Sequence, residues 1–176
     1  MVFKELQLPL MVLKMTEIDL IKLAEKAIEN LKLKNKTLAL AESCTGGWVS
    51  KIITDVSGAS TVYQGGVCSY SNEVKMNILG VREDTLATFG AVSEQVAVQM
   101  AEGVRKALKS DIGIGITGIA GPLSDNTAKP VGLIYVAITD GKTTTCTELK
   151  NNFTEEIRLQ NRMSAVKTAL TLLGDI

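Results

Sequence analysis

The order of apolar and polar residues predicts helices and strands that alternate along most of the chain. Apolar residues recur at helical spacing within 20–31 and within 96–108. Short apolar runs at 38–41 and 111–117 are typical of buried strands. The full predicted set comprises helices at 16–31, 48–53, 71–80, 94–109 and 154–173, and strands at 38–41, 62–70, 111–117, 131–139 and 143–149.

Local signals mark where several of these elements begin and end. Thr16-Glu17-Ile18-Asp19 resembles a capping box at the start of the first helix. Ser71 and Gly80 are suited to begin and end the short helix between them. Gly65-Gly66 indicates a bulge in the second strand. Asp140-Gly141 is a strong hairpin signal, so we expect the last two strands to pair antiparallel.

These elements predict one α/β domain, a three-layer sandwich in which a mixed parallel and antiparallel sheet is flanked by helices. A chain of 176 residues is long enough for one such domain. We assign the domain to 16–176 and interpret 1–15 as an N-terminal extension or edge segment. Its apolar stretch is short for a signal sequence and has no Ala-x-Ala site.

Charge and cysteine content narrow the function classes. Nineteen basic and nineteen acidic residues cancel, so no global charge favours nucleic acid or an anionic membrane. No window approaches the roughly twenty apolar residues of a membrane-spanning helix. The three cysteines form no CxxC pair, which favours a reducing compartment and argues against zinc. We expect a cytoplasmic protein without a metal or other cofactor, and without nucleic acid or membrane as partner.

The chain contains no histidine. Histidine-based serine or cysteine catalysis within one chain is therefore excluded, as is every histidine-ligated metal site. Any general base must be a lysine, aspartate, glutamate or tyrosine. This single absence restricts the possible chemistry more than any other feature of the composition.

A candidate nucleophile lies where the first predicted strand meets the second predicted helix. Ser43, Cys44 and Thr45 offer three hydroxyl or thiol groups in consecutive positions, and Gly46-Gly47 lets a ligand approach the backbone closely. The first amides of a helix have no partner within it and favour an anion. Ordinary helix capping, above all by Thr45, is the alternative interpretation.

Lys75 is the leading candidate for a base that acts without histidine, because burial can keep a lysine neutral. It follows the second predicted strand, which should lie beside the first, so it can return to the same edge as Ser43. An exposed helix lysine explains the same pattern. Arg158 and Arg162 lie four residues apart on the last helix and could bind a carboxylate or phosphate, or form solvated ion pairs with Glu155 or Glu156.

Gly113-Ile114-Gly115-Ile116-Thr117-Gly118 matches the GxGxxG pattern of dinucleotide-binding folds. In those folds the glycines form the turn between a strand and a helix. Here they lie within a predicted strand that leads into a loop. We interpret them as small residues that let a neighbouring element pack closely.

Five ordered blocks of the chain resemble the CinA C-terminal domain, the nicotinamide-nucleotide amidohydrolase family, over about residues 18–173. The blocks are Ala41-Glu42-Ser43-Cys44-Thr45-Gly46-Gly47, Tyr70-Ser71-Asn72-Glu73-Val74-Lys75, Gly90-Ala91-Val92-Ser93-Glu94, Gly118-Ile119-Ala120-Gly121-Pro122 and Lys129-Pro130-Val131-Gly132.

The resemblance implies hydrolysis of the carboxamide of nicotinamide mononucleotide, giving nicotinic acid mononucleotide and ammonia in pyridine nucleotide salvage. It implies that Ser43 is the nucleophile and Lys75 its base. Backbone amides near Thr45, Gly46 and Gly47 would then hold the oxyanion. Neither a metal nor another cofactor is implied, and the expected assembly is a homodimer.

The resemblance also implies a set of residues that contact the substrate. These are Tyr70, Gly118, Gly121, Arg158 and Arg162. The chain departs from the family at two places. Glu156-Ile157 replaces the Gly-Asp that precedes Arg158, and 123–128 replaces a glycine-rich segment. A non-catalytic nucleotide-binding or regulatory module, and an amidohydrolase for another substrate, are therefore alternative functions.

Overall fold

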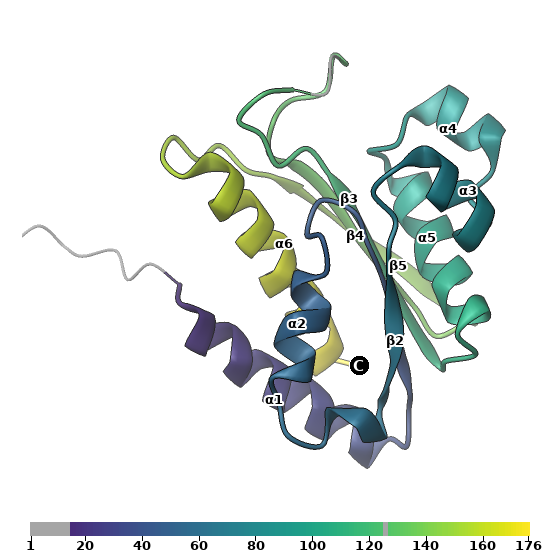
Figure 1. Ribbon diagram of the computed structural model, residues 1–176, viewed down its shortest axis with the longest axis vertical. Coiled ribbons are helices and arrows are strands. Elements are labelled where there is room, and N and C mark those ends of the chain that lie inside the picture. The colour runs from purple at the N-terminus through teal and green to yellow at the C-terminus, as the bar shows by residue number, and fades with distance from the viewer. Residues whose placement is uncertain (1–14, 125–126) are drawn as a thin grey trace, which may run out of the picture.

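The computed structural model, which describes residues 15–124 and 127–176, contains a five-stranded mixed sheet between two layers of helices (Figure 1). The strands are β1 (Leu38–Glu42), β2 (Tyr63–Cys68), β3 (Ile112–Gly118), β4 (Leu133–Thr139) and β5 (Thr144–Lys150). The helices are α1 (Glu17–Leu33), α2 (Trp48–Thr54), α3 (Asn72–Leu79), α4 (Glu83–Phe89), α5 (Glu94–Ala107) and α6 (Ile157–Gly174), with a 3₁₀ turn η1 at Ala59–Thr61. The expected three-layer α/β architecture is confirmed. Apart from Met15, the proposed N-terminal extension lies outside the described residues.

The sheet has the order β2-β1-β3-β4-β5. Its first three strands are parallel, and β3, β4 and β5 pair antiparallel. The expected hairpin at Asp140-Gly141 joins β4 to β5. The expected bulge is also present, but the register shift falls at Gln64, one residue before the Gly65-Gly66 pair. This order places the ends of β1, β2 and β3 side by side at one edge.

Successive residues of β1 face opposite helical layers, because side chains alternate along a strand. Leu38 and Leu40 belong to the large core beneath α1, α2 and α6. Ala39 and Ala41 pack in the smaller core beneath α3 and α5. In Figure 1 the two groups of helices lie on opposite sides of the sheet. This alternation sends Glu42 toward α2 and leaves Ser43 on the side of α3.

Glycines bring α5 into direct contact with β3. A Cβ atom at Gly113 would lie 2.2 Å from the Ala101 carbonyl oxygen, and one at Gly115 would lie 2.2 Å from the Ala97 carbonyl oxygen. Contacts this short leave no room for a side chain. Gly113 and Gly115 both lie inside β3, so the glycine pattern serves helix packing, as the sequence indicated.

Helix boundaries agree with the expected ones where a side chain caps the helix. The capping box of α1 is present, because Thr16 Oγ1 accepts the Asp19 amide and the Asp19 carboxylate accepts the Thr16 amide. Ser71 and Ser93 accept amides at the starts of α3 and α5. The sequence prediction missed α4, whose N-cap residue Arg82 makes no side-chain cap.

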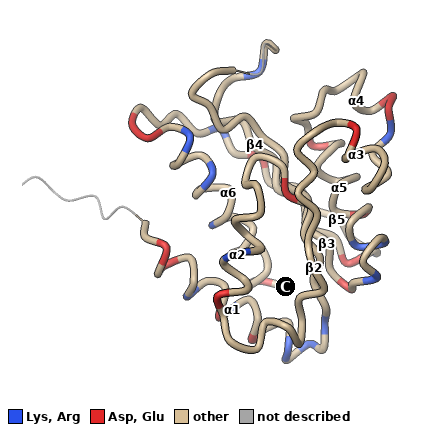
Figure 2. Tube along the Cα trace, viewed as in Figure 1, with Lys and Arg blue, Asp and Glu red and all other residues tan. Residues whose placement is uncertain are grey.

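Charged residues of both signs are distributed over the fold (Figure 2). Basic residues recur along α6, acidic and basic residues mix over α1 and α5, and α4 carries only the acidic Glu83 and Asp84 (Figure 2). Across residues 15–124 and 127–176, no helix is both long and apolar enough to cross a membrane.

Candidate active site

A cavity of about 260 Å³ opens where β1, β2 and β3 end. Its volume is near the lower end of the range for small-molecule sites. The carboxyl ends of parallel strands meet at one edge, and ligands commonly bind there in open α/β sheets. The lining includes Ser43, Tyr70, Lys75, Thr117, Gly118 and Arg158.

Ser43 and Lys75 meet at the floor of this cavity. Lys75 Nζ lies 3.2 Å from Ser43 Oγ, which confirms the predicted proximity. Lys75 is on α3, which begins directly after β2, and this short connection returns it to the end of β1. Only 2% of the Lys75 residue surface is exposed. The alternative of an exposed helix lysine is therefore wrong.

Burial makes the neutral form of the Lys75 amine more accessible than that of an exposed lysine. Burial lowers the pKa of its amine from the usual 10.5. The amine lies 2.7 Å from the Ser69 carbonyl oxygen and 3.5 Å from that of Tyr70. A neutral amine has two N–H donors and one lone pair. With both donors on these carbonyls, the lone pair is left for the hydroxyl of Ser43.

This lowered pKa predicts how stability depends on pH. Between its folded-state pKa and 10.5, Lys75 binds fewer protons in the folded than in the unfolded chain, so its contribution to the free energy of unfolding rises with pH. We expect Lys75→Met to be more stable than wild type at pH 7, with a difference that shrinks by about pH 10. Urea unfolding at both pH values measures it. A difference that does not change with pH would contradict the lowered pKa.

Cys44 and Thr45 are less suited than Ser43 to act as the nucleophile. Burial raises the pKa of the Cys44 thiol to about 12, so the reactive thiolate is disfavoured near pH 7. Thr45 is fully buried, and its hydroxyl makes no hydrogen bond. The idea that Thr45 caps α2 is therefore wrong. The cap position belongs to Gly47, which has φ of +90° and no side chain with which to cap.

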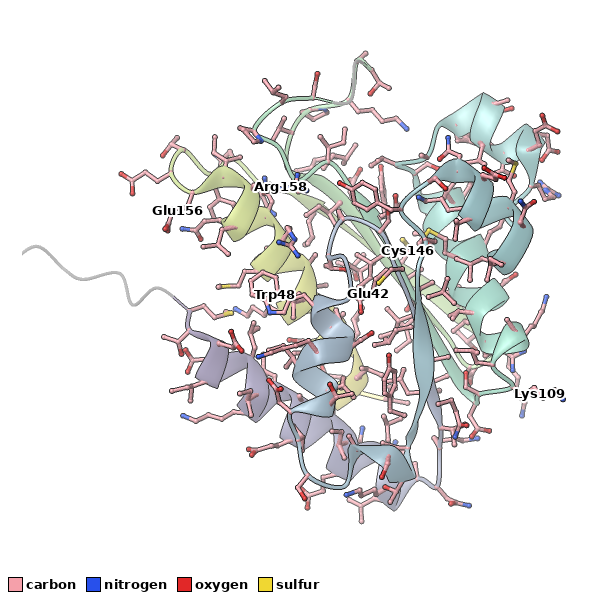
Figure 3. The ribbon with its side chains drawn as sticks, viewed as in Figure 1. Glu42, Trp48, Lys109, Cys146, Glu156 and Arg158 are labelled. Carbon is pink, nitrogen blue, oxygen red and sulfur yellow. The ribbon has the colours of Figure 1, made fainter. Side chains whose placement is uncertain are left out.

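A carboxylate of the protein itself occupies the start of α2. Glu42 is 1% exposed, and it accepts the amides of Gly47, Val49 and Ser50 at 2.8 to 3.1 Å and the Ser50 hydroxyl at 2.6 Å. In Figure 3 it lies beside the start of α2. The helix start is thus already filled by an anion, and no second one is needed there.

The expected oxyanion donors therefore need correction. The Gly47 amide is bound to Glu42, and the Gly46 amide donates to the Ser43 carbonyl oxygen at 3.1 Å. The hydrogen bonds found for the described residues include none donated by the amides of Cys44 or Thr45. Sequence reasoning also overlooked Glu42, although a carboxylate at the end of a buried strand, six residues before the start of a helix without a side-chain cap, is an available signal.

The first two turns of α6 hold the loop that follows β3. Arg158 donates to the Gly121 carbonyl oxygen at 3.0 Å and to the Tyr70 hydroxyl at 3.4 Å. Asn161 donates to the Ala120 carbonyl oxygen at 3.0 Å. Figure 3 shows Arg158 near the start of α6. Arg158 lines the cavity, as do Tyr70, Gly118 and Gly121, so four of the five residues expected to contact the substrate lie in its wall.

Arg162 has a different position. Its Nε donates to the Cys44 carbonyl oxygen at 3.1 Å and its Nη2 to the Thr45 carbonyl oxygen at 2.7 Å. Its guanidinium also lies 5.2 Å from the centre of the Trp48 ring, where α2 meets α6 (Figure 3). The residues that line the cavity do not include Arg162. We therefore revise the expectation that it contacts the substrate.

Glu156 begins α6 in a left-handed conformation, with φ of +45°. Glycine adopts this conformation without the penalty that a side chain incurs. The backbone thus has the geometry suited to the glycine that the resembling family carries here. The departure in sequence at Glu156-Ile157 leaves Arg158 at the cavity.

The segment around Ala91 and Val92 forms another wall of the cavity. Thr117 Oγ1 donates to the Ala91 carbonyl oxygen at 2.8 Å, and the Lys129 ammonium donates to the carbonyl oxygens of Phe89 and Val92. Lys129 belongs to the last of the five sequence blocks, but the sequence predicted no role for it. In the part of the chain that the structure describes, no cluster of metal-ligating side chains is present.

Comparison with known proteins places this geometry in a family. The CinA C-terminal domain model matches residues 20–176. Similar proteins include a nicotinamide-nucleotide amidohydrolase PncC of Shigella flexneri, 43% identical over 88% of this chain and 94% of that protein, and one of Escherichia coli K12, 49% identical over 70% of this chain and 74% of that protein. The crystal structure of the competence/damage inducible protein CihA from Agrobacterium tumefaciens is 36% identical with a TM-score of 0.83, over 88% of this chain and 93% of that one. The chain therefore belongs to the CinA C-terminal domain family.

Proposed function

We propose that this chain is an amidohydrolase that converts nicotinamide mononucleotide to nicotinic acid mononucleotide and ammonia. The observation that carries the proposal is the contact of 3.2 Å between Lys75 Nζ and Ser43 Oγ in a cavity at the strand ends. The two PncC relatives, whose names give nicotinamide nucleotides as the substrate, support it. A carboxamide is the group that such a pair would attack.

In the first half of the reaction, neutral Lys75 accepts the proton of the Ser43 hydroxyl while Ser43 Oγ attacks the carboxamide carbon. A tetrahedral intermediate with an oxyanion forms. As it collapses, the bond from carbon to nitrogen breaks, and the Lys75 ammonium gives its proton to the departing nitrogen. Ammonia leaves, and the acyl group remains as an ester on Ser43.

In the second half, Lys75 takes a proton from water, and the resulting hydroxide attacks the ester carbon. The bond from carbon to Ser43 Oγ breaks, and Lys75 returns its proton to that oxygen. The carboxylic acid is released with the enzyme restored. Because the base serves both halves, a pKa below the usual lysine value favours it, and burial lowers the pKa of Lys75.

In this mechanism the backbone amides of Cys44 and Thr45 bind the oxyanion. The residue that follows a nucleophile at a strand-to-helix turn commonly supplies such a donor. The Gly46 and Gly47 amides are already bound within the protein. We assign the phosphate of the substrate to Arg158, a cation that lines the cavity and donates to the Tyr70 hydroxyl.

Release of ammonia from nicotinamide mononucleotide by the purified protein tests the proposal. We expect steady turnover that falls by about a thousandfold or more in Ser43→Ala, because the nucleophile and its base act as a unit. Thr61→Ala, an exposed change on η1 away from the cavity, is the control. Full turnover in Ser43→Ala would remove Ser43 from the mechanism.

The same assay decides between the alternative functions. Calorimetric binding of nicotinamide mononucleotide without ammonia release would indicate a non-catalytic module. Ammonia from another amide in a substrate panel, with none from the mononucleotide, would assign a different substrate. Homodimerisation and a cytoplasmic location remain predictions.

A further inference from the structure

We propose that Arg162 is a positioning residue that fixes the oxyanion-binding amides of the nucleophile turn. The nucleophile turn is defined here as residues 43–47. The inference rests on the proposed function, because it assigns how that reaction's oxyanion site is built. It also replaces the expectation that both arginines of α6 meet the substrate.

The first contact of Arg162 sets the direction of the Thr45 amide. A trans peptide is planar, and its N–H points opposite to its carbonyl. The carbonyl of Cys44 and the amide of Thr45 belong to one such plane. Because Arg162 Nε holds the Cys44 carbonyl oxygen at 3.1 Å, the Thr45 N–H points away from the guanidinium. Thr45 itself is fully buried, which limits rotation of this plane.

The second contact sets the direction of the Cys44 amide through one intermediate step. Arg162 Nη2 holds the Thr45 carbonyl oxygen at 2.7 Å, which fixes the plane that contains the Gly46 amide. That amide donates to the Ser43 carbonyl oxygen at 3.1 Å. The Ser43 carbonyl shares its plane with the Cys44 N–H. Three consecutive peptide planes are thereby fixed by one guanidinium and one backbone hydrogen bond.

The guanidinium is itself held in place and kept from the ligand. It is half-buried and lies over the Trp48 ring at 5.2 Å. Its neighbour on α6, Asn161, is buried and bound to Ala120. Glu42 accepts the amide of Gly47, the last residue of the turn, and that of Val49 in α2. The nucleophile turn is thus held by a cation at its carbonyls and by an anion at the amides just beyond them.

Arg162→Gln tests the proposal, with Lys167→Gln as the matched control. Lys167 is an exposed cation on the same helix, so the control removes an equal charge without touching the nucleophile turn. Loss of one oxyanion donor typically lowers kcat by about a hundredfold or more. We expect Arg162→Gln to lower kcat by about thirtyfold or more with KM within about threefold of wild type. Arg162→Lys, which keeps the charge but not the two-pronged donor, should fall in between.

A fluorophosphonate reagent gives a readout that needs no substrate. Ser43 Oγ attacks phosphorus, fluoride leaves, Lys75 takes the proton, and the phosphoryl oxygen needs the same two amides. We expect slower labelling of Ser43 in Arg162→Gln by a factor similar to the loss in kcat, and partial recovery in Arg162→Ala on addition of methylguanidinium.

The outcomes separate the two proposals. A raised KM with unchanged kcat and labelling would overturn the positioning role and restore Arg162 as a substrate contact. The fraction of folded protein is measured by circular dichroism for Arg162→Gln and Arg162→Lys. If in both variants the labelling fell only by as much as this fraction, the positioning role would also be overturned. If wild type were labelled at Ser43 but released no ammonia, the proposed substrate would be wrong. The ratio of labelling rates between wild type and Arg162→Gln would then decide the role of Arg162.

Discussion

Lys75→Met is expected to lower kcat for amide hydrolysis by about a thousandfold, which is within the range for loss of a general base. The methionine side chain fills a similar volume but cannot accept the proton of Ser43 Oγ, which lies 3.2 Å from the Lys75 amine. Lys75 is 2% exposed, the chain contains no histidine, and the described residues that line the cavity include no aspartate or glutamate. Ammonia release under saturating substrate measures the effect.

Two further measurements make this result specific. Lys22→Met removes an exposed lysine of α1 and should retain wild-type turnover. In wild type, kcat/KM should fall at low pH as Lys75 becomes protonated, and the midpoint should lie below 10.5 because burial lowers its pKa. Turnover within threefold of wild type in a folded Lys75→Met would exclude Lys75 as the base.

Gly115→Ala is expected to lower the free energy of unfolding by about 3 kcal/mol, the upper part of the usual range for overpacking a core. The added methyl carbon would lie 2.2 Å from the Ala97 carbonyl oxygen and 2.6 Å from the Ala101 amide nitrogen. Both atoms belong to the α5 backbone, so the helix must shift away from β3 as a unit. Urea unfolding measures the change.

Gly174→Ala is the matched control for this substitution. A Cβ atom at Gly174, in the last turn of α6, would meet only the Lys26 side chain, at 3.5 Å or more. We expect its unfolding free energy to remain within about 0.5 kcal/mol of wild type. If Gly115→Ala were as stable as Gly174→Ala, close packing would no longer explain the glycines of β3.

The fold was predictable where local patterns and burial agree. The apolar run at 38–41, the capping box at Thr16 and the Asp140-Gly141 hairpin each specify their element from neighbouring residues alone. Helix α4 lacks such a signal, since Arg82 provides no cap and only Thr85 is buried along the helix. The start of α6 was misplaced at Thr154 because the left-handed backbone of Glu156 has no local mark in the sequence.

The candidate site was predictable in its residues but not in all their positions. The absence of histidine pointed to Lys75, and strand order then brought it to Ser43. Glu42 was overlooked although its partners, from Gly47 to Ser50, lie within eight residues of it. The two arginines of α6 depend on contacts between distant segments, because they share a helical face but donate to different groups. A spacing of four residues on a helix does not tell that Arg158 lines the cavity while Arg162 binds backbone carbonyls.

The bond from Arg162 to Cys44 spans 118 residues of sequence. During synthesis, the serine and the lysine emerge long before the helix that holds the turn between them. A chain released after β5 would contain Ser43 and Lys75, but Cys44 and Thr45 would be free to rotate. We expect such a fragment to be inactive as a hydrolase, so that catalytic competence arises only when the last helix has been translated and docked.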